Sequence, residues 1–273
     1  MQPKNTWIFD VDGVLTHPKE KKILQTTLLD YIIKFLQNGE PVAFNSGRSL
    51  IWLENQILNP LLDKIQNKKI LSQLFIVGEK GAYWNSYSND GIQNQNFDPS
   101  ISVPQDLLQK VRTLIQSKFS GTMFFDSTKK TMISIEMKQG TDLYLFRQQQ
   151  QSLVTTLNQF LTPAQKQTIK IDPTTIATDI EKRHVGKALG TQKIIDWLSQ
   201  NGQIVDHFYT FGDSPSDLEM PEKLYQIYQE PNKITFIFVG EKLPFPEKSH
   251  PFKTLHYTGF DQGTRNFFST LTH

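Results

Sequence analysis

The first apolar segment of the chain ends in two aspartates, and this junction constrains the fold and the chemistry more than any other feature. Trp7-Ile8-Phe9 is typical of a buried strand, and Asp10-Val11-Asp12-Gly13 follows it directly. Residues two apart on a strand share a face, so both carboxylates can converge on one point where the strand ends. Two close carboxylates repel each other unless a cation lies between them, and a hard divalent metal suits oxygen ligands. A strand followed by an ordinary Asp-Gly turn is the structural alternative.

The composition excludes several classes of function. The 273 residues are 37% hydrophobic and 21% charged, with a formal net charge of +2, which fits a globular protein with a sizeable core. Short basic runs such as 19–22 are expected to be solvated surface, so no nucleic-acid partner is expected. The chain has no cysteine, which excludes disulfides and thiol chemistry. We expect no signal peptide and no membrane span, and therefore a cytoplasmic protein without a membrane partner.

Helical and strand patterns alternate near both ends of the chain. Continuous apolar strands separated by helices are typical of a parallel sheet that is covered on both faces. We therefore predict an α/β core domain with a Rossmann-like parallel sheet. The patterns that support it lie at 23–36, 41–44, 50–57, 74–77, 187–198, 207–211 and 234–239.

The middle of the chain breaks this alternation. Residues 85–96 are polar and predict a linker or an exposed hairpin, and a helix-strand-strand pattern then occurs twice up to about residue 180. This pattern predicts a small α+β domain inserted into the α/β domain. The predicted boundaries are 1–84 for the first part of the core, 85–183 for the insertion and 184–273 for the second part of the core.

Polar clusters follow several of the predicted strands. In open parallel sheets, ligands bind outside the carboxyl ends of the strands, so clusters that are distant in sequence are expected to meet there. An aspartate pair beside a divalent metal suits an aspartyl nucleophile with an acid/base partner. Taken singly, each cluster has a plain structural explanation as a loop or a helix cap, but together they favour one catalytic site. The clusters are Asp10 with Asp12, Ser46-Gly47-Arg48, Gly78-Glu79, and Asp213 with Asp217.

These clusters resemble the four motifs of the haloacid dehalogenase superfamily of phosphohydrolases and phosphotransferases. Asp10-Val11-Asp12-Gly13-Val14 is similar to the first motif, and Ser46-Gly47-Arg48 to the second. Lys187 takes the position of the third, and Gly212-Asp213-Ser214-Pro215-Ser216-Asp217 that of the fourth. All four occur in order, each at its expected element, and they cover the α/β domain at both ends of the chain.

The insertion lies between the second and third motifs, where members with a C2-type cap domain carry theirs. Glu79-Lys80-Gly81-Ala82 resembles the segment that leads into the cap in Cof-like, trehalose-phosphatase and phosphomannomutase relatives. The chain departs from many of these relatives at Ser216, where they have Asn, and at Ala188, where they have Gly. Neither position is expected to perform the chemistry, so the departures put the subfamily in doubt more than the activity.

The resemblance implies roles for the two aspartates of the first motif and for a metal. Asp10 would attack phosphorus and form an aspartyl-phosphate. Asp12 would protonate the leaving oxygen and then activate water, so we expect its pKa to be raised toward the working pH. The cofactor implied is Mg²⁺, held by the Asp10 carboxylate, the Asp12 main-chain carbonyl and Asp213.

The other motifs imply a binding site for the phosphoryl group. The Ser46 hydroxyl and the Gly47 amide would cradle its oxygens, and Lys187 would neutralise the charge that they share with Asp10. Asp217 would orient Lys187 or a metal-bound water. Arg48 is left open between support of the phosphate site and a structural ion pair. For their neighbours Asn45 and Glu79, supporting or structural roles are expected.

The cap is expected to select the substrate. Ser134, Glu136 and Lys138 alternate with apolar residues, which predicts a strand with one polar face. That face would either hydrogen-bond a polyol or simply contact water.

The function predicted from these residues is a Mg²⁺-dependent phosphohydrolase. Its substrate would be a small phosphorylated metabolite, with a sugar phosphate as the best guess, and the reaction would pass through an aspartyl-phosphate. Two alternatives stay open: a phosphosugar mutase or phosphotransferase, and a catalytically silent metabolite-binding protein of the same fold. A dehalogenase is disfavoured, because a halide leaving group needs neither an acid nor a metal. The oligomeric state is not predicted.

Overall fold

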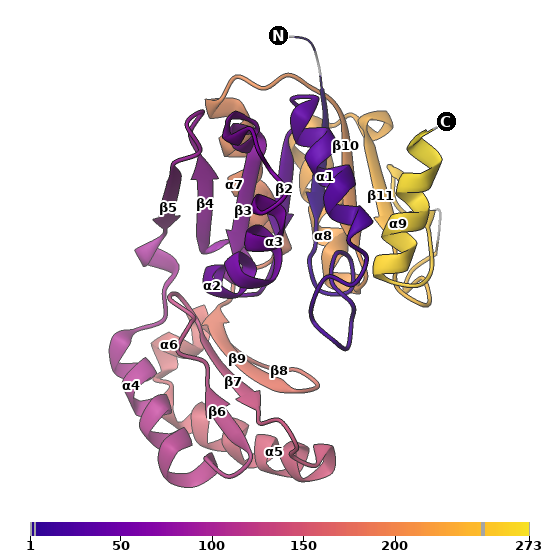
Figure 1. Ribbon diagram of the computed structural model, residues 1–273. Coiled ribbons are helices and arrows are strands. Elements are labelled where there is room, and N and C mark those ends of the chain that lie inside the picture. The colour runs from indigo at the N-terminus through magenta and orange to yellow at the C-terminus, as the bar shows by residue number, and fades with distance from the viewer. Residues whose placement is uncertain (1, 3, 247–248, 273) are drawn as a thin grey trace. The chain divides into compact units, whose positions relative to one another are not determined.

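The computed structural model describes residues 2, 4–246 and 249–272, which belong to two compact units (Figure 1). Met1–Asn96 and Gly186–His273 form the first unit, and Phe97–Val185 form the second. We call them the core unit and the inserted unit. The prediction of one domain inserted into another is therefore consistent with the way the chain divides.

The core unit is built on an eight-stranded sheet with the order β12-β11-β10-β1-β2-β3-β4-β5. The strands from β12 to β3 pair in parallel, and β4 pairs antiparallel with β3. The predicted parallel α/β sheet is confirmed. Its strands are β1 (Lys4–Phe9), β2 (Val42–Asn45), β3 (Leu74–Gly78), β4 (Tyr83–Tyr87), β5 (Gln93–Phe97), β10 (Val205–Gly212), β11 (Ile234–Phe238) and β12 (Lys253–His256).

Helices cover both faces of this sheet, which explains why its central strands are apolar throughout (Figure 1). One hydrophobic cluster joins alternate strand residues such as Trp7 and Phe9 to α1, α2 and α9. A second cluster joins the intervening residues, such as Ile8, to α7 and α8. The helices of the core unit are α1 (Thr27–Gln37), α2 (Leu50–Leu53), α3 (Asn59–Leu62), α7 (Lys187–Gln200), α8 (Glu219–Tyr228) and α9 (Asp261–Ser269).

The inserted unit has its own sheet and its own core. The strand order is β6-β7-β9-β8, and each neighbouring pair is antiparallel. Alternate residues such as Ile133, Ile135 and Ile180 pack against residues of α4 and α5 in a separate hydrophobic cluster. The elements are α4 (Gln105–Leu114), β6 (Met123–Phe125), β7 (Ile133–Met137), α5 (Leu143–Phe160), α6 (Pro163–Thr168), β8 (Ile169–Pro173) and β9 (Ala177–Lys182).

The structure divides the chain at other positions than the sequence predicted. Residues 85–96, which the prediction assigned to the insertion, belong to the core unit, where β4 and β5 extend the core sheet. Asn85 of β4 is fully buried and pairs with Ile76 of β3. The outermost strand, β5, is largely exposed, and an exposed edge strand needs few apolar residues. The predicted alternative of a hairpin therefore agrees with β4 and β5, but this hairpin belongs to the core sheet, and the inserted unit spans 97–185 rather than 85–183.

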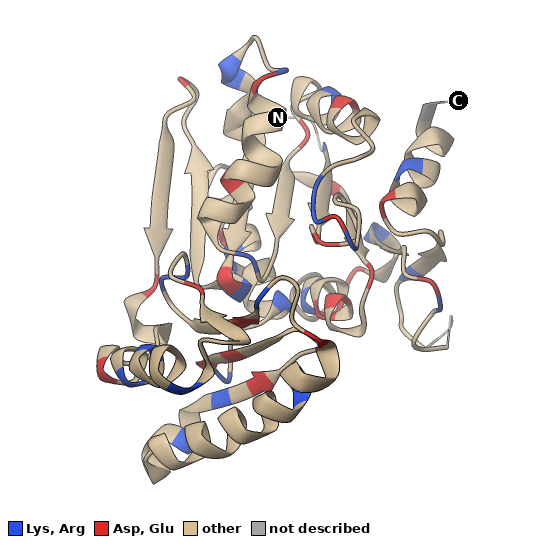
Figure 2. Cartoon of the chain, turned by 60° about the horizontal axis from the view of Figure 1, so that its bottom comes forward, with Lys and Arg blue, Asp and Glu red and all other residues tan. Residues whose placement is uncertain are grey.

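Figure 2 shows acidic and basic residues side by side in loops of the core unit rather than segregated by sign. Within the residues that the structure describes, no helix is long and apolar enough to cross a membrane.

Replacement of Trp7 tests the packing that holds β1 in the sheet. Its ring is 2% exposed and stacks on Phe35 at 4.1 Å and on Tyr209 at 4.4 Å between ring centroids. Because Trp7→Ala leaves a cavity there, we expect the free energy of unfolding to fall by about 3–5 kcal/mol. Urea unfolding followed by circular dichroism measures the change. Tyr144→Ala, at a 72% exposed position of α5, is the matched control and is expected to change it by less than about 0.5 kcal/mol.

Candidate active site

The topology brings the predicted site residues to one edge of the core sheet. β1 lies between β10 and β2, and all three run in the same direction, so their carboxyl ends are neighbours. Asp10 follows β1, Ser46 follows β2 and Asp213 follows β10. The amide of Asp10 donates to the carbonyl of Phe211, and the amide of Ser46 donates to that of Val77, each at 2.9 Å. These bonds fix the first residue beyond β1 and beyond β2.

Lys187, the first residue of α7, makes the central contacts of the site. Its Nζ lies 2.6 Å from Oδ1 of Asp10 and 2.7 Å from Oδ1 of Asp217. It also donates to the main-chain carbonyl of Asn45 at 2.8 Å. An ammonium has three N–H groups, and these three oxygens match them. All of these side chains are nearly or fully buried, so Lys187 is a fixed cation between two carboxylates.

The charge state of Lys187 follows from these contacts. Burial on its own lowers the pKa of the ammonium, because it removes water from the charged form. The charges of Asp10 and Asp217, with their hydrogen bonds, outweigh burial, and the pKa of Lys187 is raised above its ordinary value. The side chain is therefore protonated at neutral pH.

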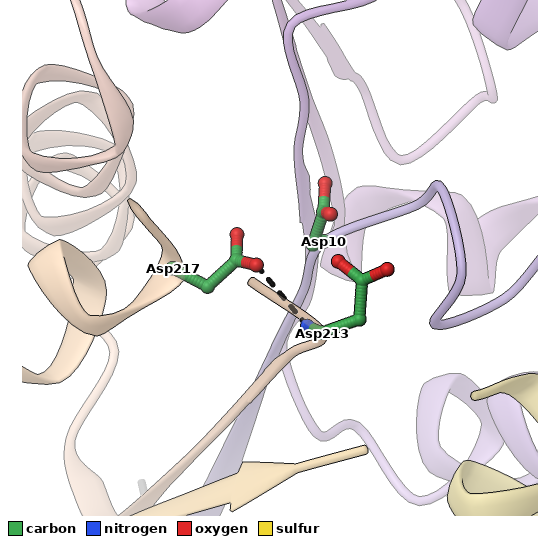
Figure 3. A group of neighbouring side chains, drawn as sticks. All are labelled: Asp10, Asp213 and Asp217. Carbon is green, nitrogen blue, oxygen red and sulfur yellow. Dashed lines mark hydrogen bonds between the residues drawn. The ribbon is translucent and has the colours of Figure 1, made fainter. Parts of the chain in front are cut away.

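Asp10, Asp213 and Asp217 form an acidic cluster in which Asp10 and Asp217 are buried and Asp213 is partly buried (Figure 3). One carboxylate oxygen of each lies within 4.8 Å of the others. Burial raises the pKa of Asp10 well above its ordinary value; Lys187 opposes this effect, and the neighbouring carboxylates add to it. Burial and the charge of Asp217 raise the pKa of Asp213 to about 7. Crowded, partly desolvated carboxylates of this kind fit a hard divalent cation, which would supply the charge that the cluster lacks.

Asp217 makes several hydrogen bonds and an ion pair, and these contacts connect it to the other residues of the cluster. Its Oδ2 accepts hydrogen bonds from the amide of Asp213 at 3.1 Å and from the amide and hydroxyl of Ser214 at 3.0 and 2.8 Å (Figure 3). Its Oδ1 faces Lys187. Because both oxygens are engaged, Asp10 and Asp213 are the carboxylates better able to accept a metal ion.

Gly13 has no side chain, and the Asp213 carboxylate occupies the space that a side chain at this position would need. The residue has φ of +75°, and a Cβ atom there would lie 2.1 Å from Oδ2 of Asp213. Only glycine combines this backbone conformation with so close an approach.

Asp12 has a different environment from the one that the sequence predicted. Arg48 binds it through both oxygens, with Nε to Oδ2 at 2.8 Å and Nη2 to Oδ1 at 3.0 Å, and Nζ of Lys21 lies 3.2 Å from Oδ1. Burial raises the pKa of Asp12, but the hydrogen bonds and charges of Arg48 and Lys21 outweigh it, and the pKa is lowered. The expectation of a raised pKa was wrong for this state of the protein, because it did not foresee the two cations.

Ser46 and Gly47 lie beside this cluster on the loop after β2. Ser46 is 1% exposed, and its Oγ accepts a hydrogen bond from the amide of Arg48 at 3.2 Å, which leaves the hydroxyl hydrogen for another acceptor. Gly47 is only partly buried. The loop therefore combines a hydroxyl donor with main-chain amides, the groups that hold phosphoryl oxygens.

Asn45 has a larger part in the site than the sequence indicated. Its side-chain amide donates to the carbonyl of Lys187 at 2.9 Å and to the hydroxyl of Thr191 at 3.3 Å. A Cβ atom on Gly190 would lie 2.0 Å from Oδ1 of Asn45, so this side chain packs directly on α7. A polar residue at the end of the apolar strand β2 was the available signal. It does not reveal that the partner is on α7.

Lys21 and Glu219 are site residues that sequence reasoning missed. Oε2 of Glu219 on α8 accepts a hydrogen bond from the amide of Ala188 at 3.1 Å, in the first turn of α7. Lys21 belongs to the basic run that was expected to be solvated surface. Nothing in either local pattern identifies a partner so far away in the chain.

The polar face predicted for the strand at 133–137 is only partly as expected. The hydroxyl of Ser134 donates to Asp179 of β9 at 2.7 Å, so the polar side chains of β7 and β9 share a face. Lys138 lies beyond the end of β7, and its ammonium donates to the carbonyl of Ser120. The strand ends before Lys138, so the alternation does not extend to it.

Comparisons with known proteins identify solved structures of similar fold. Scans against protein-family models and curated proteins find no match. Among solved structures, the C-terminal domain of C. albicans trehalose-6-phosphate phosphatase has a TM-score of 0.67 and 16% identity, over 99% of this chain and 94% of that one. A haloacid dehalogenase-like hydrolase from Bacteroides thetaiotaomicron has a TM-score of 0.65 and 12% identity, over 99% and 100%. An Aspergillus fumigatus trehalose-6-phosphate phosphatase has a TM-score of 0.56 and 15% identity, over 98% of this chain and 92% of that one.

Removal of the Asp213 charge tests the electrostatics of the metal-free cluster. Because the pKa of this carboxyl rises from 3.8 to about 7 on folding, its ionisation destabilises the folded state as the pH rises through that interval. With EDTA present at about pH 8, we expect Asp213→Asn to raise the free energy of unfolding by about 1–2 kcal/mol, after allowance for solvent screening. Thermal unfolding measures the difference, and at about pH 4 it should disappear. An Asp213→Asn protein less stable than the parent in EDTA would contradict this description.

Proposed function

We propose that this chain, which has the haloacid dehalogenase-like fold, is a Mg²⁺-dependent phosphatase that acts on a small phosphorylated metabolite. The observation that carries the proposal is the buried cluster in which Lys187 joins Asp10 to Asp217, with Asp213 alongside, at the carboxyl edge of a parallel sheet. A structural ion pair would need no third carboxylate. A phosphoryl-transfer site needs a nucleophile, a fixed cation and an acidic place for a metal.

Asp10 is the proposed nucleophile. Lys187 engages Oδ1 of Asp10, which keeps the carboxylate oriented and leaves the other oxygen for attack. That oxygen forms a bond to phosphorus while the bond from phosphorus to the substrate oxygen breaks. Water then attacks the aspartyl-phosphate, which releases inorganic phosphate and restores the carboxylate. Mg²⁺, held by Asp10, Asp213 and the main-chain carbonyl of Asp12, would neutralise charge on the phosphoryl oxygens.

Asp12 is the proposed acid and base. It gives a proton to the leaving oxygen and later takes one from the attacking water. Its bidentate pair with Arg48 opposes the first step, because the pair favours the ionised carboxylate. A bound phosphate ester competes for Arg48 and Lys21, and loss of these partners frees Asp12 to carry a proton. Arg48 would then have both of the roles that the sequence left open. It would pair with Asp12 before the substrate binds and would support the phosphate afterwards.

Ser46, Gly47 and Lys187 are proposed to hold the transferring group. Ser46 offers a hydroxyl, Gly47 an amide and Lys187 a positive charge. Asp217 and Asn45 position Lys187 without contact to the substrate. This division of roles agrees with that implied by the sequence motifs.

A sugar phosphate is the proposed substrate class. Two of the similar structures are trehalose-6-phosphate phosphatases, and the inserted unit has a polar sheet face on which Ser134 hydrogen-bonds to Asp179. Hydroxyl and carboxylate groups on a rigid sheet suit the hydroxyls of a polyol. We propose that the enzyme acts in the cytoplasm, on a small molecule, with neither nucleic acid nor membrane as a partner.

Replacement of the nucleophile tests the proposal directly. With a panel of phosphorylated metabolites and p-nitrophenyl phosphate, we expect the parent protein with Mg²⁺ to release phosphate and Asp10→Asn to lose about 10³-fold or more in rate. Asp106→Asn, at an exposed position of α4, is the matched control and should keep full activity. Equal activity of Asp10→Asn and the parent would contradict the mechanism. Isomerised sugar phosphate without free phosphate would favour the mutase, and binding without turnover would favour the silent binding protein.

Metal removal gives a second test. We expect EDTA to abolish phosphate release and Mg²⁺ to restore it, since a divalent cation must lie between the acidic cluster and an anionic substrate. Asp213→Asn should raise the Mg²⁺ concentration needed for half-maximal rate by about 10-fold or more. Titration of the rate with MgCl₂ measures this. Activity that survives complete chelation would exclude the metal-dependent mechanism.

A further inference from the structure

Lys80 lies in a strained turn beside the proposed phosphate site, and none of the roles above uses it. Glu79, Lys80 and Gly81 follow β3 with φ of 48°, 57° and 100°. Three consecutive residues with positive φ are unusual, and two of them carry side chains that disfavour this region of backbone space. Strained backbone of this kind persists only where its surroundings fix it, and it is frequent at functional sites.

The main chain of this turn is fixed by two other segments of the site. The amide of Lys80 donates to the carbonyl of Ser46 at 3.1 Å, and the amide of Gly186 donates to the carbonyl of Lys80 at 2.9 Å. The amide of Glu79 donates to the carbonyl of Arg48 at 2.9 Å. Lys80 thus lies between the loop of Ser46 and the residue that precedes Lys187. Its position is set by the same elements that form the proposed phosphate site.

The side chain of Lys80 extends along that loop. Its Cγ and Cε each lie 3.6 Å from the point where Gly47 would carry a Cβ atom. Two separated carbons at the same distance mean that the aliphatic chain runs across Gly47, and the ammonium is one bond beyond Cε. Gly47 is the residue whose amide is proposed to hold a phosphoryl oxygen.

Lys187, Arg48 and Lys21 are the cations described so far at this site. Lys187 is matched by three oxygens, and Arg48 and Lys21 bind Asp12. A phosphate ester brings further negative charge, and a lysine ammonium is a suitable point charge for it. Glycine or asparagine would adopt the backbone of residue 80 more readily than lysine does, so lysine is held there at a conformational cost.

We propose that Lys80 is a further substrate-contacting residue, whose ammonium binds an anionic oxygen of the phosphate held at Ser46 and Gly47. This inference extends the proposed function. It rests on that function in one respect, because it takes the bound anion to be the phosphate group of a substrate. Anion binding by Lys80 does not itself require hydrolysis.

Four substitutions at residue 80 distinguish the effect of the side chain from the effect of the backbone strain. Lys80→Ala removes the ammonium and keeps the strain, whereas Lys80→Gly and Lys80→Asn remove the ammonium and relieve the strain. Lys80→Arg keeps the charge. The matched control is Lys34→Ala, at an exposed position of α1. Circular dichroism and thermal unfolding of each variant check that it is folded.

Two measurements follow on the Mg²⁺-loaded full chain: the Kd of inorganic phosphate by calorimetry, and KM and kcat with p-nitrophenyl phosphate. We expect Lys80→Ala, Lys80→Gly and Lys80→Asn each to bind phosphate about 10- to 100-fold more weakly, while Lys80→Arg stays within about 3-fold of the parent. KM should rise with Kd in the same variants.

The outcomes distinguish this proposal from the proposed function. Phosphate binding that is unchanged in Lys80→Ala, or restored in Lys80→Gly and Lys80→Asn, overturns the role of the ammonium, whether or not the parent is a phosphatase. A parent that binds phosphate through Lys80 but hydrolyses no ester supports the binding role and refutes the phosphatase. A parent that neither binds phosphate nor hydrolyses esters refutes both.

Discussion

Lys187 connects two carboxylates that lie on different segments of the chain, and the carboxyl edge of the core sheet depends on these contacts. Asp10 follows β1 and Asp217 follows β10, while the ammonium between them stands at the start of α7. Desolvation makes a buried ion pair a weak source of stability, and loss of one partner leaves an uncompensated charge. With Asp213 adjacent, three carboxyl groups share the positive charge of Lys187, and the pKa values of Asp10 and Asp213 are raised. Such an arrangement is better explained by the binding of a cation and an anion than by stability.

The same principle separates the two aspartates of the first motif. Asp10 is crowded by carboxylates, and its pKa is raised, whereas Asp12 faces Arg48 and Lys21, and its pKa is lowered. Groups two residues apart thus have opposite electrostatic environments, a recurrent sign of divided acid–base roles. The proposed arrival of a phosphate ester redistributes the cations, since Arg48 and Lys21 cannot fully serve Asp12 and the phosphate at once. Lys80 would add charge on the side of Gly47.

The sequence predicted the parts of this protein that depend on local pattern. Continuous apolar strands gave the parallel sheet, and the topology of such a sheet then brought Asp10, Ser46 and Asp213 to one edge. The hairpin alternative for residues 85–96 agrees with β4 and β5, but their place in the core sheet was not predicted, because an edge pair needs few apolar residues. The partners of Asn45, Glu219 and Lys21 were missed because each lies on a different element, and spacing along the chain carries no record of such contacts. The pKa of Asp12 was mispredicted for the same reason.

We propose that the cluster around Lys187 makes Asp10 a nucleophile toward phosphorus, and trapping of the covalent intermediate is the sharpest test of this role. A rapid acid quench during turnover of a hydrolysed phosphate ester, followed by reduction with tritiated borohydride, converts an aspartyl-phosphate to labelled homoserine. Peptide mapping then locates the label. We expect label at position 10 in the parent protein and none in Asp10→Asn. Turnover with label at another residue, or with no label under any quench time, would contradict it.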